Sequence, residues 1–222
     1  MVSAGEPGTV DRAAQQAFVR HVERAVELGF VGDPEVEVHL DNARAFAEAI
    51  PRGARLLDLG SGGGLPGIAL LALRPDLEVT LLDAQHRRCD LLRSTVESWP
   101  NEITGRVVEG RAENLARTED LDGAFDVVVA RLFGAPAVTA ECAVRFLRPD
   151  SGVLLVSEPP DIAPDRWPAD GLNELGLVDV GLSGVEREPV AGRARIRMIR
   201  RQGDLPARYP RPVGRPAKRP LF

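Results

Sequence analysis

The sequence predicts an α/β protein with a doubly wound, mostly parallel sheet and a helical cap at its N-terminus. Three observations lead to this prediction. Short apolar runs alternate with helical segments from residue 55 onward. The runs are nearly continuous rather than alternating, which is typical of parallel strands covered on both faces. A glycine-rich loop directly follows the first run and precedes a helical segment, as in Rossmann-like folds.

The composition favours one soluble globular domain with a small appendage. The chain has 222 residues, of which 44% are hydrophobic and 27% charged, and no apolar run approaches the roughly 20 residues that cross a bilayer. The first thirty residues carry charges such as Glu6, Asp11 and Glu23, unlike a signal peptide. The two cysteines and three histidines show no metal-ligand spacing. We therefore expect a cytoplasmic protein with no metal and no membrane segment.

Residues 1–52 are predicted to form the helical cap. Residues 11–28 carry an apolar stripe that includes Phe18 and Val22, and Gly29 follows as a stop signal. A second stripe, from Ala43 to Ile50, ends before Pro51. We expect His21 to be a surface residue and His39 to have a structural hydrogen-bonding role where the cap meets the core.

Residues 53–202 are predicted to form the Rossmann-like domain. The apolar runs predict strands, with further strands later in the chain, over residues 55–59, 79–83, 106–109, 125–130, 153–157, 177–182 and 194–199. Between the first five strands, the periodicity predicts helices over residues 66–73, 84–98 and 137–147. In the last strand, arginines at 193, 195 and 197 alternate with apolar residues, so the three guanidinium groups are expected on one face.

Residues 203–222 are predicted to be a basic, proline-rich tail. Five Pro and five Arg or Lys residues fall in these twenty positions, with one acidic residue. Proline removes backbone donors and restricts φ, so we expect the tail to be extended rather than packed. From residue 185 to 222 the net charge is +8, whereas the rest of the chain has −13. A basic end on an acidic body indicates an interaction segment, commonly for nucleic acid.

The glycine loop predicts a nucleoside-binding site. It reads Leu-Asp-Leu-Gly-Ser-Gly-Gly-Gly-Leu-Pro-Gly over residues 57–67. Asp58 lies two residues before Gly60, where a carboxylate suits the ammonium group of S-adenosylmethionine better than a pyrophosphate. Asp83 ends the next strand, where it can accept both ribose hydroxyls. Asp58, Gly60, Ser61, Gly62 and Asp83 together indicate the cofactor pocket of a class I S-adenosylmethionine-dependent methyltransferase.

Several motifs extend this interpretation to one family. The likeness is carried by five stretches of the chain. They are residues 58–68, Leu-Leu-Asp-x-x-x-Arg-Arg-x-x-x-Leu at 81–92, Gly-Arg-Ala-Glu at 110–113, Phe-Asp-Val-Val-Val-Ala-Arg at 125–131 and the ending at 208–221. With these motifs the chain resembles the bacterial ribosomal RNA small subunit methyltransferase G family, RsmG or GidB. The resemblance implies methylation of guanine N7 in 16S rRNA, with S-adenosylmethionine as donor and the rRNA or small ribosomal subunit as partner.

The family's contacts carry over residue by residue. Cofactor contacts would fall on Gly60 and Leu65 of the loop, on Ala112 and Glu113, and on Arg131. Contacts with RNA would fall on Arg87, Arg111 and Arg193. We also assign Arg131 the catalytic position, because it follows the fourth strand at the end that faces the crevice. Its planar fork of donors suits guanine O6, a phosphate or the cofactor, and the alternative is an ion pair with Asp126 or Glu158.

The residues suit N7 chemistry. Guanine N7 has a free lone pair at neutral pH, so the reaction needs alignment rather than a general base. Glu158 follows the fifth strand where the family has Lys-Gly, and a carboxylate there would repel phosphate. Two alternatives therefore stand beside rRNA methylation. One is a divergent methyltransferase that acts on a small molecule, and the other is a non-catalytic relative that binds RNA or a partner through its basic end.

Overall fold

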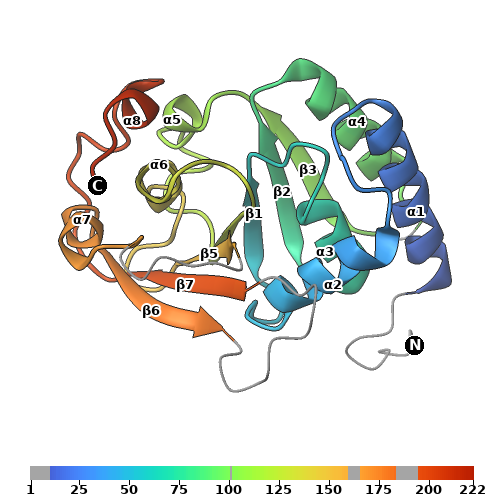
Figure 1. The fold of residues 1–222 in the computed structure, drawn as a ribbon, viewed down its shortest axis with the longest axis horizontal. Helices are drawn as coiled ribbons and strands as arrows, with labels where there is room; N and C mark the ends of the chain where they lie inside the picture. Colours follow the sequence, from blue (N-terminus) through green and yellow to red (C-terminus); the bar gives the residue numbers. More distant parts are fainter. Residues whose placement is uncertain (1–10, 101, 160–165, 184–194) are drawn as a thin grey trace.

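The protein is described by a computed structural model that covers residues 11–100, 102–159, 166–183 and 195–222. Its centre is one seven-stranded sheet in the order β3-β2-β1-β4-β5-β7-β6 (Figure 1). The strands are β1 (Arg55–Leu59), β2 (Glu78–Asp83), β3 (Thr104–Glu109), β4 (Val127–Ala130), β5 (Val153–Glu158), β6 (Leu177–Ser183) and β7 (Arg195–Arg201). The helices are α1 (Arg12–Glu27), α2 (Val36–Ala47), α3 (Gly67–Leu73), α4 (His86–Glu97), α5 (Ala112–Leu115), α6 (Pro136–Val144), α7 (Ala169–Glu174) and α8 (Arg215–Lys218).

The first five strands are parallel, which confirms the doubly wound fold. β1 lies inside the sheet, where Leu57 is paired with Thr80 of β2 on one side and with Val128 of β4 on the other. β7 is antiparallel to both of its neighbours, β5 and β6. The strand order reverses between β1 and β4, so the crevice above their carboxyl ends is where such sheets bind ligands.

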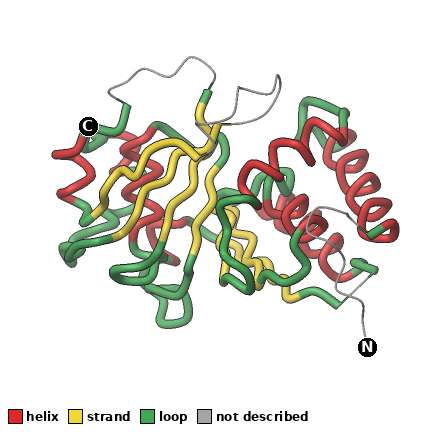
Figure 2. Tube along the Cα trace, turned by 90° about the horizontal axis from the view of Figure 1, so that it is seen from below, coloured by secondary structure: helices red, strands yellow, loops and turns green. Residues whose placement is uncertain are grey.

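Helices cover both faces of the sheet (Figure 2). Leu56 of β1 faces an apolar cluster that also contains Phe18 of α1 and Phe46 of α2. Its neighbour Leu57 faces a second cluster, which is formed with α6, α7 and the C-terminal segment. Because α1 and α2 share the first cluster with α3 and the sheet, the N-terminal helices are part of the main core.

The N-terminal helix begins and ends as its sequence predicts. The Asp11 side chain accepts hydrogen bonds from the backbone N–H groups of Ala13 and Ala14, so it caps α1. Gly29 follows the helix with φ of 70°, a conformation that favours glycine. The stripe facing the core includes His21, however, which is buried rather than exposed. Our prediction of a surface position for His21 is therefore wrong.

The arginine-bearing strand β7 lies inside the sheet, between β5 and β6. Arg197 donates to Asp179 of β6 at 2.8 Å, and its Nε lies 3.8 Å from Glu158 of β5. Arg195 is exposed, and Arg193 lies outside the described residues. An inner strand can carry Arg197 because neighbouring acidic side chains neutralise it.

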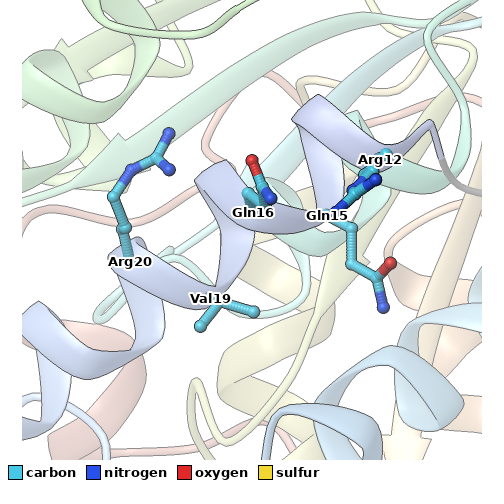
Figure 3. A pocket seen from close by; sticks show the side chains of 5 residues that line it. All are labelled: Arg12, Gln15, Gln16, Val19 and Arg20. Atoms are coloured by element: carbon cyan, nitrogen blue, oxygen red, sulfur yellow. The ribbon is translucent and has the colours of Figure 1, made fainter.

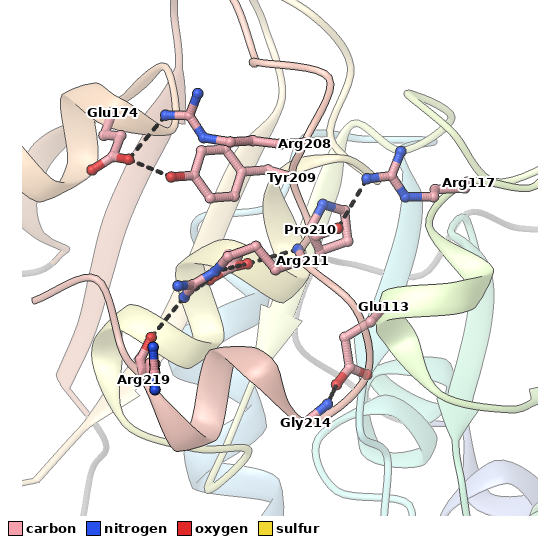
Figure 4. Close-up of polar contacts among 10 residues, drawn as sticks. Glu113, Arg117, Glu174, Arg208, Tyr209, Pro210, Arg211, Gly214 and Arg219 are labelled. Carbon is pink, nitrogen blue, oxygen red and sulfur yellow. Dashed lines mark hydrogen bonds and ion pairs between the residues drawn. The ribbon is translucent and has the colours of Figure 1, made fainter.

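The C-terminal segment, residues 203–222, is packed against the body, so our prediction of an unpacked tail is wrong. Tyr209 is buried and its hydroxyl hydrogen-bonds Glu174 of α7 (Figure 4). Arg211 forms a two-pronged ion pair with Glu141 of α6, with contacts of 2.6 to 3.1 Å. Arg117 donates to the carbonyl oxygen of Pro210 at 2.9 Å. Composition suggested an extended chain, but these specific partners hold the segment in place.

Candidate active site

The loop between β1 and α3 is tied to the ends of two strands. Its Ser61 N–H donates to the Leu82 carbonyl oxygen at 2.9 Å, and the Ser61 hydroxyl donates to the Asp58 carbonyl oxygen at 3.0 Å. Gly60 and Gly62 have φ of 72° and 55°, which a residue with a side chain rarely adopts. The glycines therefore allow a tight turn that is held against the end of β2.

Asp58 is a buried carboxylate at the base of this loop. It is 1% exposed, and its Oδ2 accepts a hydrogen bond from the Gly67 N–H at 3.0 Å. Burial raises the pKa of Asp58 to about 7, although the Gly67 N–H, the Ser61 hydroxyl and the Arg131 charge favour the ionised form. A cation that reaches this carboxylate would stabilise its charged form.

Asp83 joins the glycine loop to β2 and β3. Its Oδ2 accepts the Gly62 N–H at 2.8 Å, and its Oδ1 accepts the Gln85 N–H at 2.8 Å. Its backbone carbonyl oxygen accepts the Gly110 N–H at 2.9 Å, so the turn after β3 meets the same place. The structure thus brings the two predicted carboxylates, Asp58 and Asp83, to the same loop.

Arg131 follows β4 and lies half-buried at the crevice. Burial lowers the pKa of its guanidinium, whereas the charges of Asp58 and Asp33 act in the opposite direction. Within the described part of the chain, no hydrogen bond or ion pair holds this side chain. The predicted alternative, an ion pair with Asp126 or Glu158, is not formed, because Asp126 pairs with Arg148 and Glu158 with Arg166.

Phe133 packs over the first glycine of the loop. A Cβ atom built on Gly60 would lie 2.5 Å from Cδ2 of the Phe133 ring. Phe133 is half-buried and packs against the apolar cluster of the second face. The loop after β4 and the loop after β1 therefore touch each other at Phe133 and Gly60.

Ala112 and Glu113 lie on α5, directly after the turn that follows β3, and both are buried. Glu113 accepts the Gly214 N–H at 2.9 Å (Figure 4). The same carboxylate lies 3.5 Å from the Arg111 guanidinium. The C-terminal segment therefore packs against α5 and holds the Glu113 carboxylate in place. Leu65, on the glycine loop, is half-buried against the first apolar cluster.

The predicted RNA contacts are only partly described. Arg87 and Arg111 are both exposed on the surface, on α4 and before α5. The Arg87 guanidinium lies 5.8 Å above the centre of the Phe30 ring, and that of Arg88 lies 5.9 Å from it. Arg193 falls outside the described residues.

His21 is a residue near the site whose role the sequence interpretation missed. It is 3% exposed, and its Nε2 lies 2.8 Å from the Gly63 carbonyl oxygen in the glycine loop. Its place in the apolar stripe, three residues after Phe18 and one before Val22, was the available signal. His39 is also buried, and its Nε2 contacts the Asp33 carbonyl oxygen at 2.8 Å, as a structural role predicts.

Glu158 does not project its charge into the crevice. It is 5% exposed, and its carboxylate binds the Arg166 guanidinium and the Trp167 indole N–H. Arg197 lies 3.8 Å from the same carboxylate. The expected repulsion of phosphate by Glu158 is therefore wrong, because two arginines neutralise it. Two observations favoured a small-molecule substrate, Glu158 and the acidic body of the chain, and the first of them is thereby removed.

Two surface hollows lie away from this crevice. One, of about 330 Å³, is lined by five side chains that all come from α1 (Figure 3). The other, of about 640 Å³, lies at the opposite end of the sheet, beside Gly53 and Asp150. Among the described residues no cluster of His, Cys, Asp and Glu could hold a metal ion, and none of the helices there has the length and apolar character of a membrane span.

Comparison with known proteins assigns the chain to a family. The sequence model of the rRNA small subunit methyltransferase G family, GidB, matches residues 32–157. The chain belongs to this family. A ribosomal RNA small subunit methyltransferase G of Symbiobacterium thermophilum is 30% identical, over 97% of this chain and 92% of the relative. One from Deinococcus deserti is 36% identical over 76% of this chain and 68% of its own.

Solved structures agree with the fold of this methyltransferase G family member. A mutant of MtNAS in complex with S-adenosylmethionine aligns with a TM-score of 0.58, at 14% identity, over 86% of this chain and 73% of that one. The citrinin polyketide synthase CMeT domain aligns with a TM-score of 0.50, at 16% identity, over 83% and 57%. At such low identity these likenesses support the class I methyltransferase fold alone.

The residues of the crevice fit an S-adenosylmethionine donor. The loop offers a buried carboxylate for an ammonium group and a close approach of the backbone at glycines with positive φ. A second carboxylate, Asp83, ends β2, where adenosyl ribose hydroxyls can donate to it. A pyrophosphate would instead place two negative charges beside Asp58 and Asp83.

Proposed function

We propose that this protein methylates N7 of a guanine in 16S rRNA, with S-adenosylmethionine as methyl donor. One observation carries the proposal. The glycine loop is hydrogen-bonded to Asp83 through Gly62 and to Asp58 through Gly67, so both acids and the loop form one cradle. Family membership then supplies the substrate, because the relatives are ribosomal RNA small subunit methyltransferases. The partner is 16S rRNA or the small ribosomal subunit in the cytoplasm.

Each residue of the cradle has a distinct task in binding the donor. Asp58 receives the ammonium group, and Asp83 accepts the ribose hydroxyls. Gly60, Ser61 and Gly62 let the backbone approach the donor closely. Leu65, Ala112 and Glu113 complete the cofactor contacts. When bound, S-adenosylmethionine supplies an electrophilic methyl group on a sulfonium ion.

The protein's contribution to the chemistry is alignment and charge placement. Guanine N7 already has a lone pair, so no side chain needs to remove a proton. Arg131 is free of partners among the described residues, which leaves its fork of donors for guanine O6 or a phosphate. As N7 is methylated the purine gains positive charge, so Arg131 acts best as an orienting donor at O6 rather than beside N7.

RNA binding uses exposed cations around the crevice. Arg87 lies in the first turn of α4, just after β2, and Arg111 directly precedes α5, just after β3. Both positions follow the carboxyl ends of parallel strands, and Arg193 is assigned to the same task by its place in the family. Each phosphate that they neutralise releases a counterion, so the affinity should fall as salt rises. The buried ion pairs of β7 and of the C-terminal segment take no part.

The direct test is methylation of the small subunit. Purified protein is incubated with S-adenosylmethionine and 30S subunits or 16S rRNA from a strain that lacks the gene, and 7-methylguanosine is mapped by mass spectrometry. We expect one new 7-methylguanosine with the wild type and none with Gly60→Asp. Absence of the product with both substrates, together with donor turnover on an RNA-free metabolite extract, would overturn the proposal.

A further inference from the structure

One apolar side chain at the mouth of the crevice has an unusual environment. Leu132 is 94% exposed, whereas the other exposed large hydrophobic residues of the described chain are 36 to 49% exposed. It also has φ of 55°. That left-handed conformation brings the Cβ of a leucine close to a carbonyl oxygen, so it is normally left to glycine or asparagine. Because the side chain is exposed, no burial of apolar surface offsets the backbone strain or the contact of the side chain with water.

The neighbours of Leu132 explain why the backbone turns there. On one side Arg131 is half-buried near Asp58 and Asp33, whose charges act on it. On the other side the Phe133 ring packs over Gly60. Both neighbours are directed into the protein, and the left-handed turn leaves the side chain between them in solvent. Leu132 therefore projects into solvent from the loop that connects β4 to α6, next to Phe133, which contacts the glycine loop.

We propose that Leu132 is a substrate-contact residue that packs against the face of an unstacked base of the RNA at the mouth of the site. This inference rests on the proposed function. Enzymes that act on a base commonly take it out of its stack, and sequence-specific RNA recognition mostly uses such unstacked bases. Proteins that bind the minor groove of DNA insert apolar side chains, including Leu, against base faces and partially unstack them. Strained residues also concentrate at functional sites.

The test separates the side chain from the backbone turn. Leu132→Gly and Leu132→Asn keep a residue that accepts the left-handed conformation but remove the apolar contact. Leu132→Met keeps an apolar contact of similar size. We expect the unfolding midpoint of Leu132→Gly and Leu132→Asn not to fall, and their affinity for S-adenosylmethionine to equal that of the wild type. The kcat/KM for 30S or 16S rRNA should fall about tenfold or more, mainly through KM. Leu132→Met should retain most of the wild-type kcat/KM for the same RNA.

Asp150→Gly is the matched control. Asp150 is the other described non-glycine residue with positive φ, at 62°, and it lies at the opposite end of the sheet. Its replacement should leave both the affinity for the donor and the kcat/KM for RNA unchanged. Wild-type kcat/KM in Leu132→Gly and Leu132→Asn would overturn the inference while leaving the proposed function intact. Failure of the wild type itself to methylate RNA would overturn both.

Discussion

The imidazole of His21 on α1 lies 2.8 Å, through Nε2, from the Gly63 carbonyl oxygen in the glycine loop. Its Nδ1 lies 2.8 Å from the Thr95 hydroxyl on α4. Burial lowers the pKa of His21 to about 4, so the ring is neutral at pH 7. Because a carbonyl oxygen can only accept, the single proton of the neutral ring is on Nε2. The His21 side chain thus connects α1 and α4 to the glycine loop, which we assign to the binding of S-adenosylmethionine.

Replacing His21 should affect both stability and donor binding. We expect His21→Ala to lower the free energy of unfolding by about 2–4 kcal/mol, because it leaves a cavity and an unpaired Gly63 carbonyl oxygen. The affinity for S-adenosylmethionine should fall as the loop loses its support. Urea unfolding and calorimetric titration measure the two effects. His86→Ala, at an exposed position on α4, should change neither, and equal behaviour of the two variants would contradict this role for His21.

Donor binding should release protons below pH 7. The pKa of Asp58 is raised by burial to about 7 in the folded protein, so part of the population carries a neutral carboxyl group at pH 6.5. An ammonium group favours the charged form, so binding expels that proton, and the affinity should rise as the pH increases toward 7. Calorimetry at pH 6.5 in two buffers of different ionisation enthalpy measures the release. 5′-Methylthioadenosine has no ammonium group and should release none, and equal release by both compounds would refute the pairing.

The two glycines at 53 and 60 differ in what surrounds them. Both have positive φ, but a Cβ on Gly53 meets open space, whereas one on Gly60 would lie 2.5 Å from the Phe133 ring. We expect Gly53→Ala to lower the free energy of unfolding by about 1 kcal/mol through backbone strain alone. Gly60→Ala should lower it further and should weaken donor binding. Thermal unfolding and donor titration compare them, and an equal cost for the two variants would argue against close packing at Gly60.

The C-terminal segment depends on one buried ion pair. Glu141 is fully buried and Arg211 is its partner, so Arg211→Met would leave an uncompensated charge in the interior. We expect a loss of about 3–5 kcal/mol in the free energy of unfolding. Arg208→Met, which breaks the exposed pair with Glu174, should have little effect because solvent screens that pair. Similar urea midpoints for the two variants would show that the segment is held by other contacts.

Local patterns predicted the parallel sheet and the glycine loop because their signals are contained in short stretches. An apolar run, a glycine turn and a following helix are visible within residues 55–73. The packing of the C-terminal segment was not predictable in this way, because Arg211 meets Glu141 seventy positions earlier. The burial of Glu158 depends on the Arg166 charge and the Trp167 indole N–H, and both residues follow in a connecting segment without periodicity. His21 was misjudged by residue type, although its place in the apolar stripe indicated burial.

The proposed activity depends on the cradle formed by Asp58, the glycine loop and Asp83, and titration with S-adenosylmethionine tests this cradle most directly. Calorimetry on the wild type, Gly60→Asp and Asp83→Ala, with a nicotinamide dinucleotide as the competing ligand, distinguishes a site for S-adenosylmethionine from a site for a dinucleotide. We predict that the wild type binds S-adenosylmethionine at one site per chain, that both variants lose this binding, and that the dinucleotide does not bind. Binding of the dinucleotide alone, or unchanged binding of the donor in Gly60→Asp, would contradict the account.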